Sequence, residues 1–397
     1  MSPDLPFDII TLIIDIVGEN NDRILLKELA LVSHSFLQIC SKYLFATIIL
    51  HNATVKHHAS SKKGFVKLLE SRPDVVKHIR KLTYNVGYYI NNDDHQLSPI
   101  LLNFLPTISR LNCLTITASY QNWNTLNSSL QSALLHLMHL PTINHIDLSN
   151  IQNFPLSSLT LSVNLHRLDM FHLGYLNPLE EESSPEIIME MMPKIREFHT
   201  SSSSLLMTKL FHARTYDGRP AFNFMDLRRV SMSLDVFDDG RNTRYLLQNA
   251  KLLENFDFSV FGARNLVGIL SLSPRTLKVL NLKVALHNWG STLLGGLYEE
   301  LEALAGHNML EALSFAFHLD GDETEDFIRS IIQKVEKVLV KHASGWSVLK
   351  QVSFRVLIGP FGNSTELCEA LQSLPDKYLS HLSKLESIAF NYSACLL

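Results

Sequence analysis

The stretch LNCLTIT at residues 111–117 contains the pattern that decides the fold. Its apolar residues occupy the first, fourth and sixth positions, and INHIDLS at residues 143–149 repeats the arrangement. The last two apolar residues alternate with polar ones, as they do in a short strand that buries one of its faces. Each occurrence of the pattern therefore predicts a short β-strand.

The same pattern occurs eleven times after the first fifty residues. The middle apolar residues of successive copies lie 22 to 39 residues apart. They are Leu82, Leu114, Ile146, Leu168, Phe198, Val230, Phe256, Leu280, Leu313, Val352 and Ile388. Recurrence at such a period is typical of a repeat protein, in which each unit packs on the next.

Between the copies, apolar residues recur with helical spacing, most clearly in residues 126–140. Several of these stretches end at a proline just before the next copy, as at Pro106, Pro141, Pro193 and Pro274. Proline cannot continue a helix, and it favours extended geometry in the residue before it. We therefore expect helices between the strands, over residues 99–105, 126–140, 185–192, 243–253, 264–272, 293–305, 326–342 and 365–374.

A strand of three to five residues and a helix, repeated in this way, resemble the leucine-rich-repeat solenoid, above all its ribonuclease-inhibitor-type branch. The resemblance implies an irregular α/β repeat over residues 79–393, with parallel strands on the concave face and helices on the convex face. The asparagine that usually follows the strand is mostly missing, and Asn150 is a partial match. An ordinary α/β domain with parallel strands is the alternative.

Residues 4–50 do not follow the repeat, and they predict three short helices and a strand. Pro6 and Asp8 suit the first turn of the first helix, which is apolar almost all round. Asp22 and Ser33 are expected to cap the second and third helices. A unit of this size has a small core and tends to depend on a partner.

This first segment resembles the F-box, above all the large F-box families of fungi. Ser33 stands where that family usually has cysteine, and Phe36 where it usually has tryptophan. Phenylalanine keeps most of the apolar area of tryptophan, so we expect a weakened contact. The matching segments are LPFDII at residues 5–10, LALVSHSF at 29–36, YLF at 43–45 and IIL at 48–50.

The resemblance implies a non-catalytic subunit of an SCF-type (Skp adaptor, cullin-RING) E3 ubiquitin ligase. The F-box at residues 4–50 would bind a Skp-type adaptor, residues 51–78 would be a linker and repeat entry, and the repeats would bind a target protein. The alternative is a repeat scaffold whose F-box-like cap is structural only. The alternative for these residues is that they form the core of the small module. The adaptor-binding candidates are Leu5, Pro6, Ile9, Ile10, Ile13, Leu29, Val32 and Phe36.

The polar residues that flank the apolar strand positions point away from the core and form a grid on the concave face. We expect target contacts where charge is densest in this grid. The alternative is a solvated face whose charges pair with one another between neighbouring strands. The candidate residues are His145, Asp147, Arg167, Asp169, Glu197 and Arg229.

Composition argues against several other functions. The chain has 35 Lys and Arg against 39 Asp and Glu, whereas a dedicated nucleic-acid binder normally shows a basic excess. No stretch of 18 apolar residues predicts a membrane span, and the first residues lack the basic segment of a secretory signal. We therefore expect a cytoplasmic or nuclear protein, monomeric within its hetero-complex.

The sequence also predicts no catalytic centre, cofactor or metal site. The four cysteines are far apart, and most of the 18 histidines are isolated, so no ligand spacing of a zinc site occurs. The common motifs of hydrolases, metalloproteases and nucleotide-binding enzymes are missing from the sequence. We expect a protein that acts by binding.

Overall fold

The computed structural model divides into two compact units, Met1–Glu182 and Ser183–Leu397, which are treated separately below. The structure describes residues 6–20, 22–51, 59–86, 99–173, 190–201, 203–234, 240–261, 266–273, 275–286, 296–306, 309–319, 325–360, 364–375 and 388–397.

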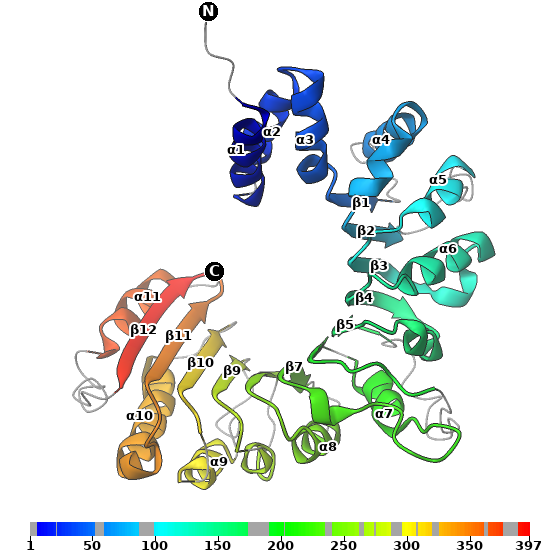
Figure 1. The fold of residues 1–397 in the computed structure, drawn as a ribbon. Coiled ribbons are helices and arrows are strands. Elements are labelled where there is room, and N and C mark those ends of the chain that lie inside the picture. The colour runs from blue at the N-terminus through cyan, green and yellow to red at the C-terminus, as the bar shows by residue number, and fades with distance from the viewer. Residues whose placement is uncertain are drawn as a thin grey trace, which may run out of the picture. The chain divides into compact units, whose positions relative to one another are not determined.

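Three helices begin the described part of the first unit (Figure 1). Asp22 accepts a hydrogen bond from the backbone N–H of Leu25, and Ser33 accepts one from that of Phe36. Each bond satisfies an amide that a helix start leaves unpaired, so both predicted N-caps are confirmed. The helices are α1 (Phe7–Glu19), α2 (Arg23–Ala30) and α3 (His34–Leu44).

The three helices share a small apolar core of Ile14, Leu26, Ala30 and Cys40. Gly18 of α1 lies against the ring of Tyr43 in α3, and a Cβ at this glycine would come within 2.4 Å of that ring. The helices therefore pack closely at this crossing, where only glycine leaves enough room.

The strands of the first unit pair in parallel and in chain order. The marked residues Leu82, Leu114, Ile146 and Leu168 are register partners in turn, as the repeat predicts. The strand predicted at the end of the helical segment also joins this sheet, because Ile48 pairs with Leu82. The strands are β1 (Thr47–His51), β2 (Lys81–Val86), β3 (Cys113–Asn122), β4 (His145–Gln152) and β5 (Arg167–Phe171).

One irregularity interrupts the pairing of β3 with β4, where the register shifts between Thr117 and Gln121. Tyr120 and Asn150 lie at this shift with φ angles of 58° and 57°. Asparagine tolerates such left-handed backbone better than most residues, which gives Asn150 a local structural role.

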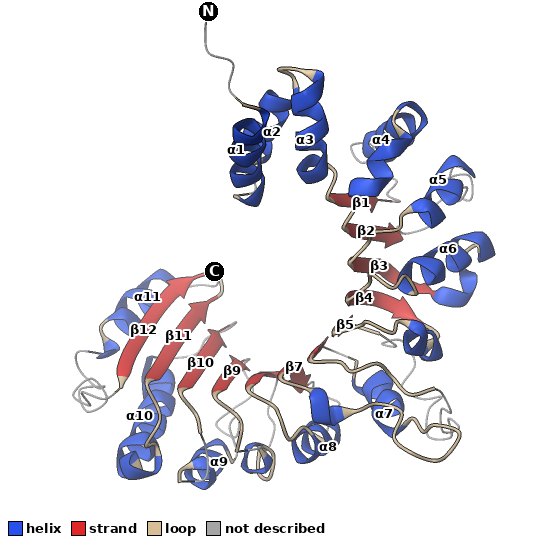
Figure 2. Ribbon diagram, viewed as in Figure 1, coloured by secondary structure: helices blue, strands red, loops and turns tan. Residues whose placement is uncertain are grey.

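Helices cover one face of these strands in the first unit (Figure 2). The predicted helices at 99–105 and 126–140 are confirmed, with slightly different ends. The α-helices are α4 (Ala59–Ser71), α5 (Pro99–Phe104) and α6 (Ser128–Met138). Short 3-10 turns occupy Pro73–His78, Leu105–Thr107, Trp123–Thr125 and Leu156–Leu161.

Within the second unit, the strands also pair in parallel and in chain order. One predicted alignment is wrong: Val352 pairs with Phe390, two residues beyond Ile388. A shift of two residues keeps each side chain on its face, so the alternating pattern could not detect it. The strands are β6 (Glu197–Ser201), β7 (Arg229–Leu234), β8 (Asn255–Phe261), β9 (Val279–Leu286), β10 (Ala312–Leu319), β11 (Gln351–Ile358) and β12 (Ala389–Leu396).

The helices of the second unit differ from the prediction at three places. The described residues 266–272 contain only turns and a 3-10 helix at Leu270–Leu272, because the chain between β8 and β9 is short. Residues 190–192 are not helical, and an additional helix follows β6. The helices are α7 (Ser204–His212), α8 (Arg241–Asn249), α9 (Leu297–Leu304), α10 (Glu325–Lys341) and α11 (Ser364–Gln372).

Apolar side chains stack in rows between the strands and helices. The rings of Phe315 and Phe354, on adjacent strands, stack at 5.1 Å. Each strand is too short to bury its own apolar face, so its neighbours in the sheet complete the core. The predicted α/β repeat with parallel strands is thereby confirmed within each unit. The boundaries at residues 50 and 78 and the F-box identity of α1–α3 stay predictions.

A truncation in one of these rows tests the core. Leu148 of β4 is fully buried, and replacing it with alanine leaves a cavity that close-packed neighbours cannot fill. We expect Leu148→Ala to lower the free energy of unfolding by about 2–5 kcal/mol in urea denaturation. Val163→Ala is the control, since Val163 is 69% exposed and its loss should change stability by less than about 0.5 kcal/mol. Equal effects of the two variants would contradict this packing.

Candidate functional site

The first helix has two apolar stripes rather than one. Ile10, Ile14 and Val17 form the stripe that packs into the three-helix core. Ile9, Ile13 and Ile16 have the same spacing on another side of the helix, and all three are exposed. The near-continuous apolar character of this sequence thus serves two surfaces, of which only one is covered within the described chain.

Other apolar side chains of the helical segment are exposed as well. A soluble protein shows scattered apolar residues on its surface, but a concentration of them within one small module marks an interaction surface. We name this set the helical apolar surface, and it consists of Phe7, Ile9, Leu12, Ile13, Ile16, Ile24, Leu25, Leu31 and Val32.

The structure divides the eight adaptor-binding candidates into two groups. Pro6, Ile9, Ile13 and Val32 are exposed, with Ile9 and Ile13 each 45% exposed and Val32 65% exposed. Ile10, Leu29 and Phe36 are partly buried against the small core. Leu5 lies outside the described residues. The motif alone could not separate contact from core, because both demand apolar residues at the same spacing.

An ion pair fixes the first helix against the third. Lys42 Nζ lies 2.7 Å from Asp15 Oδ1, and the hydrogen bond from Lys42 lowers the pKa of the Asp15 carboxyl. Both side chains are partly exposed, so the pair orients α1 more than it stabilises the module.

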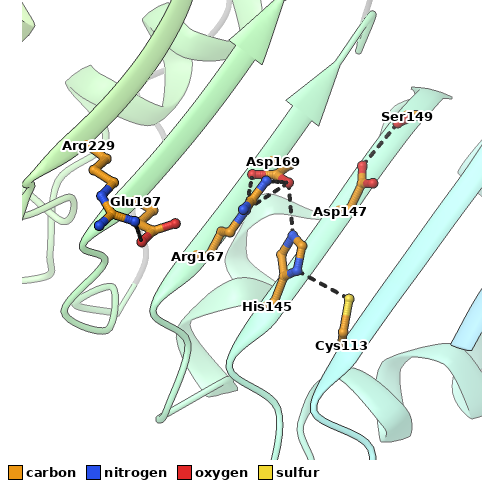
Figure 3. Close-up of polar contacts among 8 residues, drawn as sticks. All are labelled: Cys113, His145, Asp147, Ser149, Arg167, Asp169, Glu197 and Arg229. Carbon is orange, nitrogen blue, oxygen red and sulfur yellow. Dashed lines mark hydrogen bonds and ion pairs between the residues drawn. The ribbon is translucent and has the colours of Figure 1, made fainter. Parts of the chain in front are cut away.

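On the strand face of the first unit, polar side chains form a chain of contacts (Figure 3). Cys113 Sγ lies 3.2 Å from Nδ1 of His145, whose Nε2 lies 2.8 Å from Oδ2 of Asp169. Arg167 donates from Nε and Nη2 to the same carboxylate at 2.9–3.1 Å. We call Cys113, His145, Arg167 and Asp169 the histidine cluster.

Electrostatics in this cluster favour a charged histidine. Burial opposes the charged form, but the hydrogen bonds with Asp169 and Cys113 outweigh it and raise the pKa of His145 to about 9. The carboxylate of Asp169 is almost fully buried, and two cationic partners compensate for its lost hydration. His145 is therefore mostly an imidazolium at neutral pH.

The neighbouring acid Asp147 behaves differently. Burial raises the pKa of its carboxyl, while a hydrogen bond from Ser149 Oγ to Oδ1 at 3.1 Å acts in the opposite sense. Asp147 is thus adjacent to the histidine cluster but is bonded to its own strand.

The last two charged candidates belong to the second unit. Arg229 Nη1 lies 3.0 Å from Glu197 Oε1, across the pairing of β6 with β7. Arg229 is mostly exposed, and such surface pairs contribute little to stability. Apart from Asp147, the charges that the sequence singled out are thus paired with one another, either within β5 or between neighbouring strands. Target binding by these residues stays a prediction.

A hollow of about 580 Å³ lies on the strand face of β8 to β12 in the second unit. Lys283 and Arg355 line it, separated in the register by Ala316. Neither cation forms an ion pair within the described ranges. Both residues belong to the predicted polar grid, but they lie outside its most densely charged part and were not chosen as candidates. They occupy equivalent positions on alternate strands, and this regularity in the sequence could have identified them.

Metal sites and membrane-spanning helices are two further possibilities for the described residues. Within them, no group of three or more histidines, cysteines or acids has the geometry to hold a metal ion. Over the same ranges, no helix combines the length and apolar character that crossing a bilayer requires.

Comparison with known proteins gives little further information. No family model matches the chain, and no curated protein matches it significantly. A solved protein from Bacteroides fragilis, determined by the Northeast Structural Genomics Consortium, superposes with a TM-score of 0.38 at 12% sequence identity. The superposition covers 85% of this chain and 83% of that one. The fold assignment therefore rests on the strand pairing described above.

The raised pKa of His145 predicts a pH dependence of stability. A group whose pKa rises from 6.5 to about 9 on folding stabilises the protein fully below pH 6.5. This contribution disappears as the pH rises through 9. The stability difference between the unchanged chain and His145→Gln should therefore shrink by on the order of 2 kcal/mol between pH 6.5 and 9.5. Urea denaturation at a series of pH values measures it, and a difference that grows with pH would contradict the assignment.

Proposed function

We propose that this chain is a non-catalytic target-binding subunit of an SCF-type E3 ubiquitin ligase. In this proposal α1–α3 are an F-box that docks on a Skp-type adaptor, and the strand faces bind a target protein. Ubiquitin transfer takes place on other subunits, in the cytoplasm or nucleus, and the chain acts by holding the target near them.

The second apolar stripe of α1 is the observation that carries the proposal. Ile9, Ile13 and Ile16 are exposed although the same helix already supplies a full stripe to its own core. Fully burying an exposed isoleucine is worth roughly 1.5–3 kcal/mol. These three are about half exposed, so a partner that covers them would gain about half of that for each. A Skp-type adaptor fits, because the F-box resemblance assigns it to this segment.

Charge complements this apolar contact very little. Few ionisable residues lie next to this stripe in the sequence of α1. The contact would therefore depend on buried apolar area rather than on ion pairs. Interfaces of this kind bury roughly 1,600 Å² in all and concentrate their binding energy in a few central residues. Ile9 and Ile13 are one helical turn apart, and they are the best candidates for that centre.

The alternative proposal, a repeat scaffold whose helical cap is structural only, is supported by the candidates that pack into the small core. Leu29 and Phe36 pack into the small core, which is what a purely structural cap requires. A cap of that kind would tolerate polar residues on the exposed stripe, whereas an adaptor-binding F-box would not. The two proposals therefore differ at Ile9 and Ile13.

Substitution of the exposed stripe separates them. We expect Ile9→Ser together with Ile13→Ser to weaken binding of a purified Skp-type adaptor at least about 100-fold, measured by calorimetry, since two central contacts are lost. Both side chains lie away from the small core, so the free energy of unfolding should change by less than about 1 kcal/mol.

The matched control is Leu161→Ser together with Val163→Ser, which removes two exposed apolar residues outside the helical segment. This variant should bind the adaptor as the unchanged chain does. If the unchanged chain binds no adaptor at micromolar concentration, or if the Ile9 and Ile13 substitutions leave binding intact, the scaffold proposal is favoured.

For the target we favour the hollow of the second unit over the charged pairs. Lys283 and Arg355 are available for an external anion, while the charges of the histidine cluster already satisfy one another. Hydroxyl groups lie beside them, with Ser353 Oγ donating to Ser314 Oγ at 2.7 Å. Such a surface suits a target segment with acidic side chains.

Charge reversal tests this part of the proposal. A photoreactive residue in place of Ala316 should crosslink the target in cells, and Lys283→Glu with Arg355→Glu should reduce this crosslink at least tenfold. Lys350→Glu is the control, because Lys350 is exposed but pairs with Glu311 outside the hollow. A crosslink that survives the double reversal would place the target elsewhere, without bearing on adaptor binding.

A further inference from the structure

The outward side chains of β8–β12 in the second unit form rows that run across the strands. Residues that pair in register on a parallel sheet point to the same face, and neighbouring strands lie about 4.8 Å apart. One row contains both cations of the hollow. We name it the basic row, and it consists of Ser259, Lys283, Ala316, Arg355 and Ser393.

The basic row crosses the hollow, where its two cations are available to an external group. Lys283 and Arg355 are exposed, and within the described ranges neither forms an ion pair. Their strands are two apart in the sheet, so roughly 10 Å separates their backbones. Ala316 lies between them and lines the hollow with only a methyl group. The two long side chains can therefore converge above Ala316 on one carboxylate.

A polar row lies on one side of the basic row. It contains Asp257, which is the one acid that lines the hollow among the residues that the structure describes. The Asn281 side chain donates a hydrogen bond to this carboxylate, and Asn281 rather than Lys283 is its register partner. Two cations against one acid leave the hollow with a net positive charge. The polar row consists of Asp257, Asn281, Ser314, Ser353 and Asn391.

On the other side of the basic row, the outward side chains are largely apolar. Phe261 is 39% exposed, Leu357 is half-buried and Cys395 is exposed. Alternate residues of a strand share a face, so these side chains point to the same side as Lys283 and Arg355. Apolar groups beside a few polar ones are typical of a binding surface. We name this set the apolar row, and it consists of Phe261, Ala285, His318, Leu357 and Cys395.

The distance between the basic and apolar rows sets the spacing of the groups that they can bind together. Arg355 and Leu357 are two residues apart on β11, which corresponds to roughly 6.6 Å along the strand. An extended peptide has the same spacing between one residue and the second residue after it, and these two side chains point to the same side. A peptide that lies along the strands can thus place one side chain on each row.

We propose that the hollow binds an extended target segment in which an acidic residue and a large apolar residue are two positions apart, in either order. The carboxylate lies between Lys283 and Arg355, and the apolar side chain packs against Leu357. This inference rests on the proposed function, which assigns the hollow to the target, and it adds which sequence the target contains. The acid supplies charge complementarity, while the apolar residue distinguishes this segment from other acidic stretches.

Selection from a displayed library of random nine-residue peptides tests the proposal on the full chain. The Lys283→Glu, Arg355→Glu variant serves for counter-selection, because it removes peptides that bind elsewhere. We expect the retained peptides to contain Asp or Glu two positions from Leu, Ile, Met, Phe or Trp more often than at any other spacing. The proposal is overturned if no peptide is retained, if no spacing is favoured, or if the favoured spacing is the three or four residues of a helix.

A double-mutant cycle on one retained peptide locates the apolar contact. Replacing the apolar residue of the peptide with serine should weaken its binding to the unchanged chain about tenfold, measured by fluorescence anisotropy. Leu357→Ser should weaken the original peptide by a similar factor and have little effect on the serine peptide, because the contact is already lost. Leu252→Ser is the matched control, since Leu252 is 43% exposed outside the strand face, and it should change neither affinity.

Folding of the variant is checked at the buried thiol of Cys368, whose continued protection from a thiol reagent shows that the second unit is intact. Should Leu357→Ser expose Cys368, the two peptides on the unchanged chain decide. Equal binding of both peptides to the unchanged chain overturns this inference but leaves the hollow as the site of an acidic target. Adaptor binding is measured separately at α1–α3, so its failure would count against the ligase role and not against this peptide preference.

Discussion

Parallel pairing of short strands in register is the constraint on which the rest of this structure depends. Each strand contributes only a few apolar side chains, and these become a core because the equivalent residues of the next strand lie beside them. Ile146, for example, is covered by Leu114 on one side and Leu168 on the other. An unpaired strand of this length would have neither its backbone hydrogen bonds nor its core.

The same register arranges the polar face. A parallel sheet in register places each polar strand residue of one repeat beside its equivalent in the next, whatever the length of the segment between the strands. The histidine cluster arises in this way from three strands that are far apart in sequence. Lys283 and Arg355 become neighbours of one hollow for the same reason, although 71 residues separate them in the chain.

A different constraint applies to the helical segment, because α1 has more apolar residues than the small core can bury. A three-helix core of this size is filled by one stripe of α1, and a second stripe is left over. The capping residues Asp22 and Ser33 fix where α2 and α3 begin, so the exposed stripe is a property of a well-formed module rather than of a frayed end. The proposed docking function uses this surplus.

Local patterns in the sequence were enough to determine the strand positions, the two helix caps and the polarity of each strand face, because these depend on nearest neighbours along the chain. They could not determine whether β12 aligns through Ile388 or Phe390, since both lie on the same face. They also could not divide Ile9 and Ile13 from Leu29 and Phe36, because core and contact surface use the same residues. Only the tertiary structure decided which charges meet, since Cys113, His145 and Asp169 approach one another through strand pairing alone.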